Sequence, residues 1–147
     1  DFRVLKDLLP ESAGALKRTS ATGEKSAAMG MGVSQAEGKY AGAGDGRLTI
    51  KLIDTSGVGG FALAGMAMAG VEIDKETENG YERTGTVGGR KIFEKYDNRT
   101  KRGEVKMLVA NRFVVEVDGD DVPMETIKAL ATSKLDLAKL ESLAVAK

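Results

Sequence analysis

Polar and apolar positions alternate in several separate runs of this chain, which is typical of β-strands with one buried side. The clearest run covers residues 47–54, where Leu48, Ile50 and Leu52 fall on one side and Thr49 and Lys51 on the other. The same period of two predicts further strands over residues 28–41, 81–87, 90–97, 104–110 and 112–118. We also expect a short strand at residues 13–18 and a loop at residues 20–26.

Tight turns between these runs predict antiparallel pairing. Residues 42–46 form a glycine-rich turn, so the strands on either side of it are expected to form a hairpin. Gly88-Gly89 and Ala110-Asn111 are two further two-residue turns, which makes the strands from residue 81 to residue 118 a meander. The acidic residues 74–80 precede that meander and are interpreted as a loop.

One stretch, residues 57–71, has no charged side chain and is rich in Gly, Ala and Met. We predict that it forms a central helix laid across the sheet, because a helix that is apolar on every side is normally buried. A membrane span needs about 20 apolar residues, so no span is expected here. One sheet face cannot cover such a helix, and its outer side is expected to contact the terminal helices, a second subunit, a partner protein or a small apolar ligand. The binding candidates on this helix are Phe61, Leu63, Met66 and Met68.

The chain ends are predicted to be helical. Leu5, Leu8 and Leu9 have helical spacing, and Pro10 ends that helix. A second helix is expected over residues 121–130 with Asp121 as its N-cap. A final short helix is expected to follow, because Ser133 and Asp136 have the spacing of a capping box. The predicted fold is α+β: a single antiparallel sheet of about six to seven strands with a central Gly/Ala/Met-rich helix and terminal helices packed on it, in one domain of residues 1–147.

Composition narrows the function. The chain has no cysteine and no histidine, which removes disulfides, thiolate chemistry, the commonest general base and the usual zinc ligands. The 22 basic and 22 acidic residues give no net charge, so nothing steers the whole chain toward nucleic acid or an anionic membrane. The chain starts at Asp1 without an initiator Met, and we expect a processed form whose leader, if any, lies outside it.

Two motifs point weakly to ligands. Residues 57–62 spell G-x-G-x-x-A, but the preceding strand belongs to a hairpin rather than to a βαβ unit, so no cofactor is expected. Glu116, Asp118, Asp120 and Asp121 could ligate calcium, but they lack the EF-hand spacing, so no metal site is expected.

Residues 81–112 hold nine basic side chains against four acidic ones, with aromatic residues between them. A basic sheet with aromatics could bind an anion or single-stranded nucleic acid, with Arg83, Arg90 and Tyr96 as the candidate residues. Strand alternation spreads these charges over both faces, however. A solvated, edge-protecting set of charges is the favoured interpretation, and nucleic acid is disfavoured.

Six segments carry a resemblance to a known family: LLPESAGALKR (8–18), MGVSQAEGKY (31–40), GYERT (80–84), GRKIFEKY (89–96), NRFVV (111–115) and LDLAKL (135–140). Over nearly its whole length the chain resembles a family of uncharacterised bacterial cell-envelope proteins. The order of elements is also distantly similar to that of PsbP/Mog1-like α/β/α sandwiches, whose members act as accessory and binding proteins. The resemblance implies a periplasmic or lipoprotein setting and no particular active site.

We therefore predict a non-catalytic binding or accessory protein of the cell envelope. Catalysis would have to use Asp, Glu, Lys, Ser, Thr or Tyr alone, and no catalytic motif built from these residue types is present. Two alternatives stay open: anion or nucleic-acid binding through residues 81–112, and a carboxylate-dependent enzyme. A buried Asp or Glu with a strongly shifted pKa in a cleft would favour the enzyme.

Overall fold

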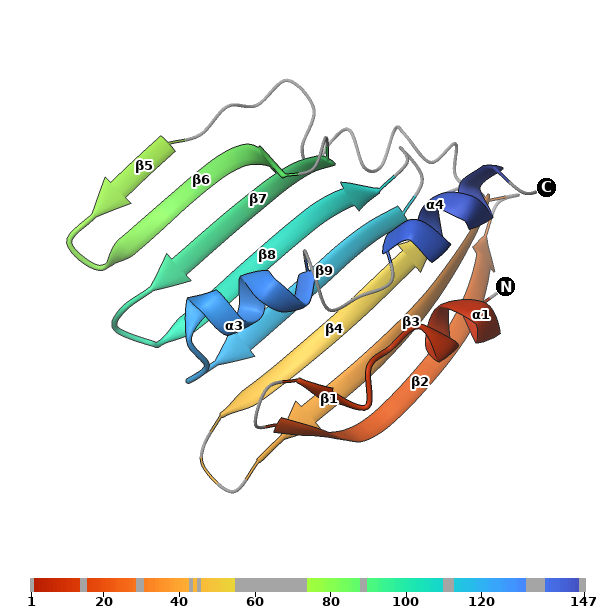
Figure 1. Ribbon diagram of the computed structural model, residues 1–147, viewed down its shortest axis with the longest axis horizontal. Helices are drawn as coiled ribbons and strands as arrows, with labels where there is room; N and C mark the ends of the chain where they lie inside the picture. Colours follow the sequence, from red (N-terminus) through yellow and green to blue (C-terminus); the bar gives the residue numbers. More distant parts are fainter. Residues whose placement is uncertain are drawn as a thin grey trace.

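The computed structural model describes residues 2–13, 16–28, 31–42, 44, 46–54, 74–87, 90–109, 113–131 and 137–145. These residues form one nine-stranded antiparallel sheet, in the order β1-β2-β3-β4-β9-β8-β7-β6-β5, with short helices on one side of it (Figure 1). The strands are β1 (Ser12–Ala13), β2 (Leu16–Ala28), β3 (Met31–Ala41), β4 (Arg47–Asp54), β5 (Asp74–Thr77), β6 (Gly80–Val87), β7 (Arg90–Asp97), β8 (Arg102–Val109) and β9 (Phe113–Asp120). The helices are α1 (Phe2–Asp7), α3 (Met124–Ala129) and α4 (Leu137–Val145).

The sheet consists of two meanders, β1–β4 and β5–β9. Pairing between their last strands, β4 and β9, joins them. β4 and β9 pair antiparallel along their whole length, with Ile50 opposite Val117 and Leu52 opposite Val115. These β-branched and leucine side chains are fully buried, so the seam between the meanders lies in the core. β1 and β5 are the outermost strands.

The core lies between the sheet and the helices, on the face that we call the helix side; the opposite face is the open side. α1 contacts β2 and β3, whereas α3 contacts β8 and β9. Alternate residues of β4, β8 and β9 are buried on the helix side, which is the pattern that their period of two dictates. The helices contribute the buried side chains of Leu5, Ile127 and Leu140, and the residues that follow α1 and α3 contribute Leu9 and Leu130.

α3 sits close to the sheet because two glycines lie beneath it. Gly103 on β8 and Gly119 on β9 are directly opposite each other. A Cβ added at Gly119 would lie 2.7 Å from Ile127 Cδ1 and 3.2 Å from Val122 Cβ, and one added at Gly103 would lie 2.6 Å from Ile127 Cδ1. The glycine pair therefore makes the room that lets Ile127 bury completely.

Tyr40 on β3 fastens the N-terminal segment to the sheet. Its ring lies over Gly38, and its hydroxyl donates a hydrogen bond of 2.6 Å to the carbonyl oxygen of Pro10. Arg18 Nη1 donates to the carbonyl oxygen of Leu9, at 3.2 Å. Burial raises the pKa of the Tyr40 phenol to about 12, although the nearby Arg18 charge acts in the opposite direction.

The predicted fold class is wrong. The molecule is mostly one large antiparallel sheet of nine strands with short helices, rather than a six- to seven-stranded sheet organised around a central helix. The predicted central helix, residues 57–71, lies outside the described residues. The antiparallel hairpins of β3 with β4, β6 with β7 and β8 with β9 are confirmed.

Three local predictions are also corrected. Residues 20–26, expected to be a loop, belong to β2, because their backbone pairs with β3 from Lys17 to Ala28. The acidic segment 74–80 includes β5, which pairs with β6. Asp121 does not cap α3: its φ is 57°, it lies in a turn beside Lys101, and the N-cap position is Pro123 without a side-chain cap.

We predict that Gly119→Ala lowers the free energy of unfolding by about 1–3 kcal/mol, because the new methyl group forces Ile127 out of a packed position. Urea denaturation measures this change. Gly85→Ala is the matched control on β6, since its Cβ would meet only Ile92 Cγ2 at 3.8 Å, an ordinary contact. Equal effects of the two substitutions would show that α3 does not rest on the glycine pair.

We predict a pH-dependent effect of Tyr40→Phe. The folded protein holds the phenol proton more tightly than the unfolded chain, so this stabilisation is fully present below pH 10 and is lost as the pH rises to about 12. Tyr40→Phe should therefore cost about 1–2 kcal/mol at pH 8, where it removes the hydrogen bond to Pro10, and the gap to the wild type should narrow toward pH 12. Denaturant titrations at several pH values measure the gap. A stability difference between the two proteins that stays constant up to pH 12 would contradict the interpretation that a buried Tyr40 phenol donates this hydrogen bond.

Candidate functional site

Three predicted binding residues, Arg83, Arg90 and Tyr96, lie on the same side of the sheet. Arg83 is opposite the buried Glu94 on the neighbouring strand. Arg90 and Tyr96 lie an even number of residues from Glu94 on β7 and therefore share its side, the helix side. The four candidates of the predicted central helix lie outside the described residues: Phe61, Leu63, Met66 and Met68.

Around Glu94 a polar network ties α3 to β6 and β7. Tyr81 Oη donates to Glu94 Oε1 at 3.2 Å, and Lys128 Nζ lies 3.0 Å from Glu94 Oε2. The Arg83 guanidinium stacks over the Tyr81 ring, 4.9 Å from its centroid. Burial and the adjacent Glu94 carboxylate raise the pKa of Tyr81. This network gives the buried Glu94 carboxylate a partner for each of its two oxygens.

Both candidate arginines already have carboxylate partners. Arg83 lies 3.7 Å from a carboxylate oxygen of Asp74 and 3.7 Å from one of Glu76, both on the neighbouring β5. Arg90 Nη2 donates to Glu141 Oε1 of α4 at 2.5 Å, while its Nε is buried without a hydrogen-bond partner. Arg90 is thus neutralised within the molecule, whereas the two carboxylates near Arg83 are exposed and lie just beyond hydrogen-bond distance.

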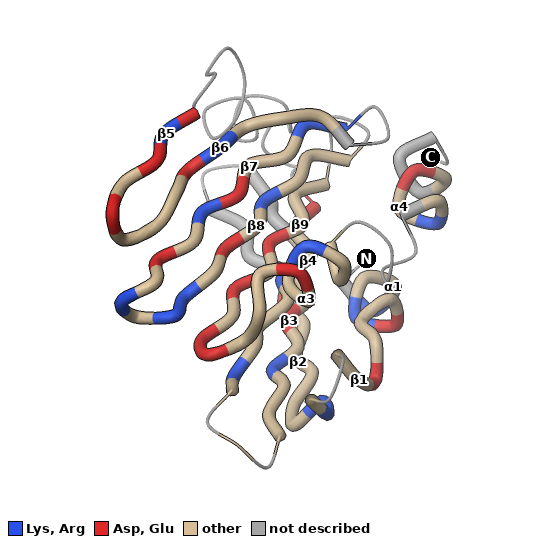
Figure 2. The backbone as a smooth tube through the Cα atoms, turned by 60° about the vertical axis from the view of Figure 1, so that its left-hand side comes forward, with Lys and Arg blue, Asp and Glu red and all other residues tan. Residues whose placement is uncertain are grey.

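Four other basic residues of the predicted patch, Lys95, Lys101, Arg102 and Lys106, also have carboxylate partners. Ion pairs connect Lys95 to Glu82 at 3.3 Å, Lys106 to Glu104 at 3.1 Å, Arg102 to Asp120 at 2.9 Å and Lys101 to Asp121 at 4.0 Å. Figure 2 shows basic and acidic positions interspersed over β5–β9 rather than gathered by sign.

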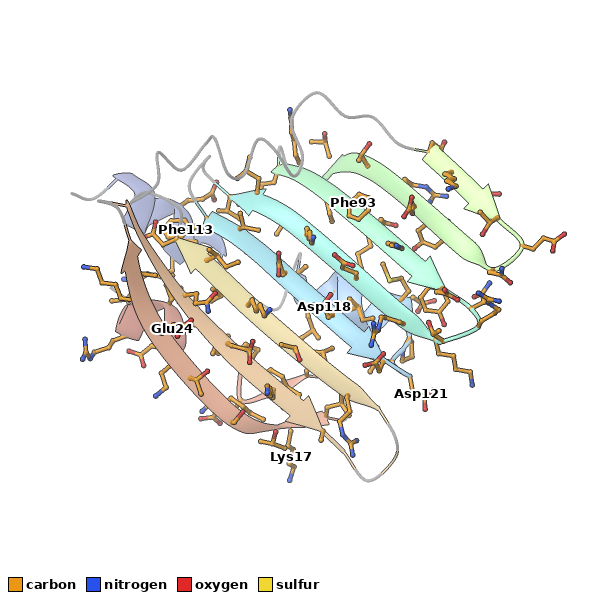
Figure 3. The ribbon with its side chains drawn as sticks, turned by 180° about the vertical axis from the view of Figure 1, so that it is seen from behind. Lys17, Glu24, Phe93, Phe113, Asp118 and Asp121 are labelled. Carbon is orange, nitrogen blue, oxygen red and sulfur yellow. The ribbon has the colours of Figure 1, made fainter. Side chains whose placement is uncertain are left out.

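Figure 3 shows the open side with its side chains, and the strand register aligns charged residues there in rows that cross the strands. One row runs Glu37, Lys51, Glu116, Lys106 on β3, β4, β9 and β8, so each charge lies opposite one of the other sign. Such cross-strand pairs stabilise a solvated sheet face. The next row breaks this alternation, because Asp118 and Glu104 are directly opposite each other.

Asp118 lines a depression of about 360 Å³, together with Arg47, Thr49, Arg102, Glu104 and Asp120. Partial burial raises the pKa of the Asp118 carboxyl, and the like charges of Glu104 and Glu116 add to this. The side chain is half-buried and the depression is open to solvent. Among the described residues no group of three or more acidic side chains is arranged to hold a metal ion.

β2 has an unpaired edge. β1 pairs only with Leu16 and Lys17, and the Arg18 N–H bonds to the Glu11 carbonyl oxygen. Within the described ranges no strand pairs with residues 19–28 on the side away from β3, and we call this line of backbone the 19–28 edge. From residue 19 to residue 25 the side chains are exposed or half-buried and mostly small: Thr19, Ser20, Ala21, Thr22, Gly23, Glu24 and Lys25.

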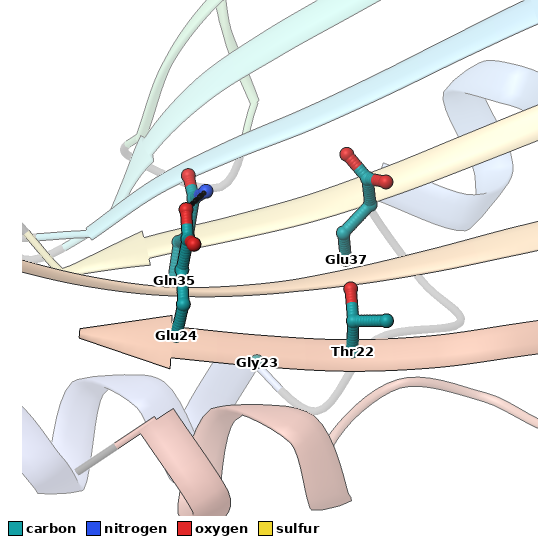
Figure 4. Close-up of a pocket in the computed structure, with 5 residues that line it drawn as sticks. All are labelled: Thr22, Gly23, Glu24, Gln35 and Glu37. Atoms are coloured by element: carbon teal, nitrogen blue, oxygen red, sulfur yellow. Dashed lines mark hydrogen bonds between the residues drawn. The ribbon is translucent and has the colours of Figure 1, made fainter. Parts of the chain in front are cut away.

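A second depression lies on the open side beside this edge (Figure 4). It measures about 220 Å³ and is lined by Thr22, Gly23, Glu24, Gln35 and Glu37. Gln35 Nε2 donates to Glu24 Oε1 at 2.6 Å. Glu37 has only distant cations, with Lys39 Nζ and Lys51 Nζ each 3.8 Å from one of its oxygens.

Sequence reasoning missed this edge and its depression. Residues 20–26 show no apolar alternation, and Gly, Ser and Thr among them favour a loop prediction. The signal that could have found the strand was the length of β3, since a long strand in a hairpin calls for a long partner.

Comparison of the chain with protein-family models, with curated proteins and with solved structures finds no match in any of the three. The resemblance to cell-envelope proteins therefore stays a prediction. No helix in the described part of the chain has the length and apolar character needed to cross a bilayer.

We predict that Asp118→Asn stabilises the protein at neutral pH by about 0.2–1 kcal/mol, because it removes a like-charge cross-strand pair. The pKa of Asp118 is higher in the folded protein than in the unfolded chain, so protonation of this carboxyl favours folding. That contribution is fully present below about pH 4 and is lost as the pH rises. The gain should therefore vanish at pH 3, where wild-type Asp118 is protonated. Chemical denaturation at the two pH values measures it. A loss of stability at pH 7 would mean that the carboxylate has a favourable partner.

Proposed function

We propose that this chain is a non-catalytic binding protein that accepts an extended polypeptide segment as an additional strand along the 19–28 edge. The observation that carries the proposal is the contrast between the two edges of the sheet. The β5 edge is four residues long and carries Asp74, Lys75 and Glu76, all exposed. Short, charged edge strands resist pairing with other chains.

The 19–28 edge is longer than β5 and less densely charged. Its ten residues extend over about 33 Å, at about 3.3 Å per residue, which exceeds the length of a typical strand. Prolines, the usual blocks, are absent from it, and its charged side chains are Glu24 and Lys25. Unpaired N–H and C=O groups along such an edge are a template for strand addition.

The edge is also held in place before any partner binds. β3 pairs with β2 as far as Ala28, and α1 lies against both strands. The Tyr40 hydrogen bond to Pro10 and the Arg18 hydrogen bond to Leu9 hold the segment that follows α1. A preorganised edge loses little conformational entropy on binding, which supports a binding role.

Two other functions have less support. Binding of an anion or nucleic acid would use Arg83 and Arg90, but Arg90 is bound to Glu141, and Arg83 has Asp74 and Glu76 each at 3.7 Å. A carboxylate-dependent enzyme is the second candidate, because Asp118 has a raised pKa in a depression. A cell-envelope setting is part of the proposal through the resemblance alone.

The test begins with nine-residue peptides selected by display against the folded chain. We predict that a proline at one of two adjacent edge positions, Thr22→Pro or Gly23→Pro, weakens peptide binding about tenfold or more. Successive N–H groups of a strand point to opposite sides, so one of these prolines removes an outward donor and the other removes a donor to β3. The variant that keeps its melting temperature is the informative one, and calorimetric titration gives its Kd.

The matched control places proline on the other edge, as Lys75→Pro and Glu76→Pro in β5. These substitutions should leave peptide affinity unchanged. Selected peptides whose affinity is insensitive to the β2 proline would bind elsewhere, and that result would overturn the proposal.

A further inference from the structure

Resting on the proposed strand addition, we infer that the added strand carries a Lys or Arg side chain on the open side, bound over Glu24 and Glu37. The inference concerns the chemistry of the partner rather than the edge itself. It starts from the alternation of side chains, which places every second residue of an added strand on the open side next to β2.

The open side beside the edge offers hydrogen-bond acceptors. Thr22 and Glu24 on β2 lie opposite Glu37 and Gln35 on β3, so the four side chains form a square around the depression (Figure 4). Gln35 donates its amide hydrogen to Glu24 Oε1, which leaves the other oxygen of Glu24 to accept from a ligand. Two carboxylates in this square suit a cationic donor.

Neither carboxylate is closely paired with a cation. Glu24 has no basic partner among the described side chains. The two lysines near Glu37 lie beyond hydrogen-bond distance, at 3.8 Å, and the Lys39 side chain is 63% exposed. Exposed pairs of this kind contribute little, so Glu37 can accept a closer partner.

The geometry permits a long basic side chain to reach both carboxylates. Neighbouring strands lie about 4.8 Å apart, so an added strand would lie about 10 Å from β3. A Lys or Arg side chain can lay its apolar stem across the short side chains of β2 and place its charge beside Glu37. The short side chain of Thr22, on the open side of β2, leaves room for that stem.

The same charges argue against a second copy of this chain as the occupant. Antiparallel pairing of two β2 strands keeps the open sides together, and on that side the 19–28 edge presents Ser20, Thr22 and Glu24. Its basic residue, Lys25, is on the helix side, opposite Ser34. Two β2 strands paired about Glu24 would therefore bring Glu24 toward Glu24, and the edge itself offers no basic side chain on that side.

The probes are labelled nine-residue peptides of alternating Thr and Val that differ only at the central residue: Lys, Gln or Glu. Fluorescence anisotropy in 50 mM salt measures their affinity for the whole chain. The Lys peptide should bind about two- to fivefold more tightly than the Gln peptide, the range expected for an opposite-charge cross-strand pair, and the Glu peptide more weakly than both. The preference should shrink in 0.5 M salt.

Variants of the chain assign the preference to its residues. Glu24→Gln with Glu37→Gln should abolish the Lys advantage, so that the Lys and Gln peptides bind the variant with equal affinity. Glu82→Gln, an open-side carboxylate on β6 that pairs with Lys95, is the control and should keep the advantage. Equal affinity for the Lys and Glu peptides would overturn this inference and leave strand addition intact. Failure of all three peptides to bind, or a stable dimer in sedimentation, would overturn it together with the proposed function.

Discussion

Pairing of β4 with β9 is the interaction on which the rest of the structure depends. It joins the two meanders through eight residues on each strand, from Arg47 opposite Asp120 to Asp54 opposite Phe113. Its helix side provides the centre of the core, where Ile50, Leu52 and Val117 are fully buried. These strands are far apart in the sequence, so their contact must overcome a large loop-closure entropy and is expected to form late in folding. The short helices, of six to nine residues, are too short to be stable alone and depend on this surface.

A single sheet has two faces and two edges, and each has to be protected or used. The helices cover one face, and the other is exposed to solvent and carries charged residues, with opposite charges paired in the row from Glu37 to Lys106. β5 blocks one edge with a short run of exposed charged and polar residues. Among the described residues, β1 covers the start of β2 alone, which leaves residues 19–28 without a paired strand on that side. The proposed function follows from this asymmetry rather than from any cluster of reactive side chains.

The sequence predicts those strands whose side chains alternate between core and solvent. β4, β8 and β9 have such a pattern, and their predicted ranges agree with the structure to within two residues at most ends. β2 and β5 were missed because backbone pairing with a neighbour, rather than burial of alternate side chains, determines them. The cap assigned to Asp121 failed because the turn against Lys101 takes that residue into the left-handed region.

The candidate site was predictable only in part. The predicted strands include Arg83, Arg90 and Tyr96, which lie on β6 and β7. The carboxylate partners of the two arginines, however, come from two other elements, β5 and α4. An ion pair between elements depends on sheet order, and sheet order is not encoded in any local pattern. The 19–28 edge has the same origin, since a strand becomes an edge only through the arrangement of all the others.

Amide hydrogen exchange of the dilute, unliganded protein tests the central claim most directly. If the 19–28 edge is open, amides from residue 19 to residue 28 should alternate: those bonded to β3 are protected, and those pointing outward exchange close to the unprotected rate. Amides of β4 and β9 should be the slowest of the chain. Uniform protection of residues 19–28 in a monomer would contradict the account, because it would mean that this edge is already covered.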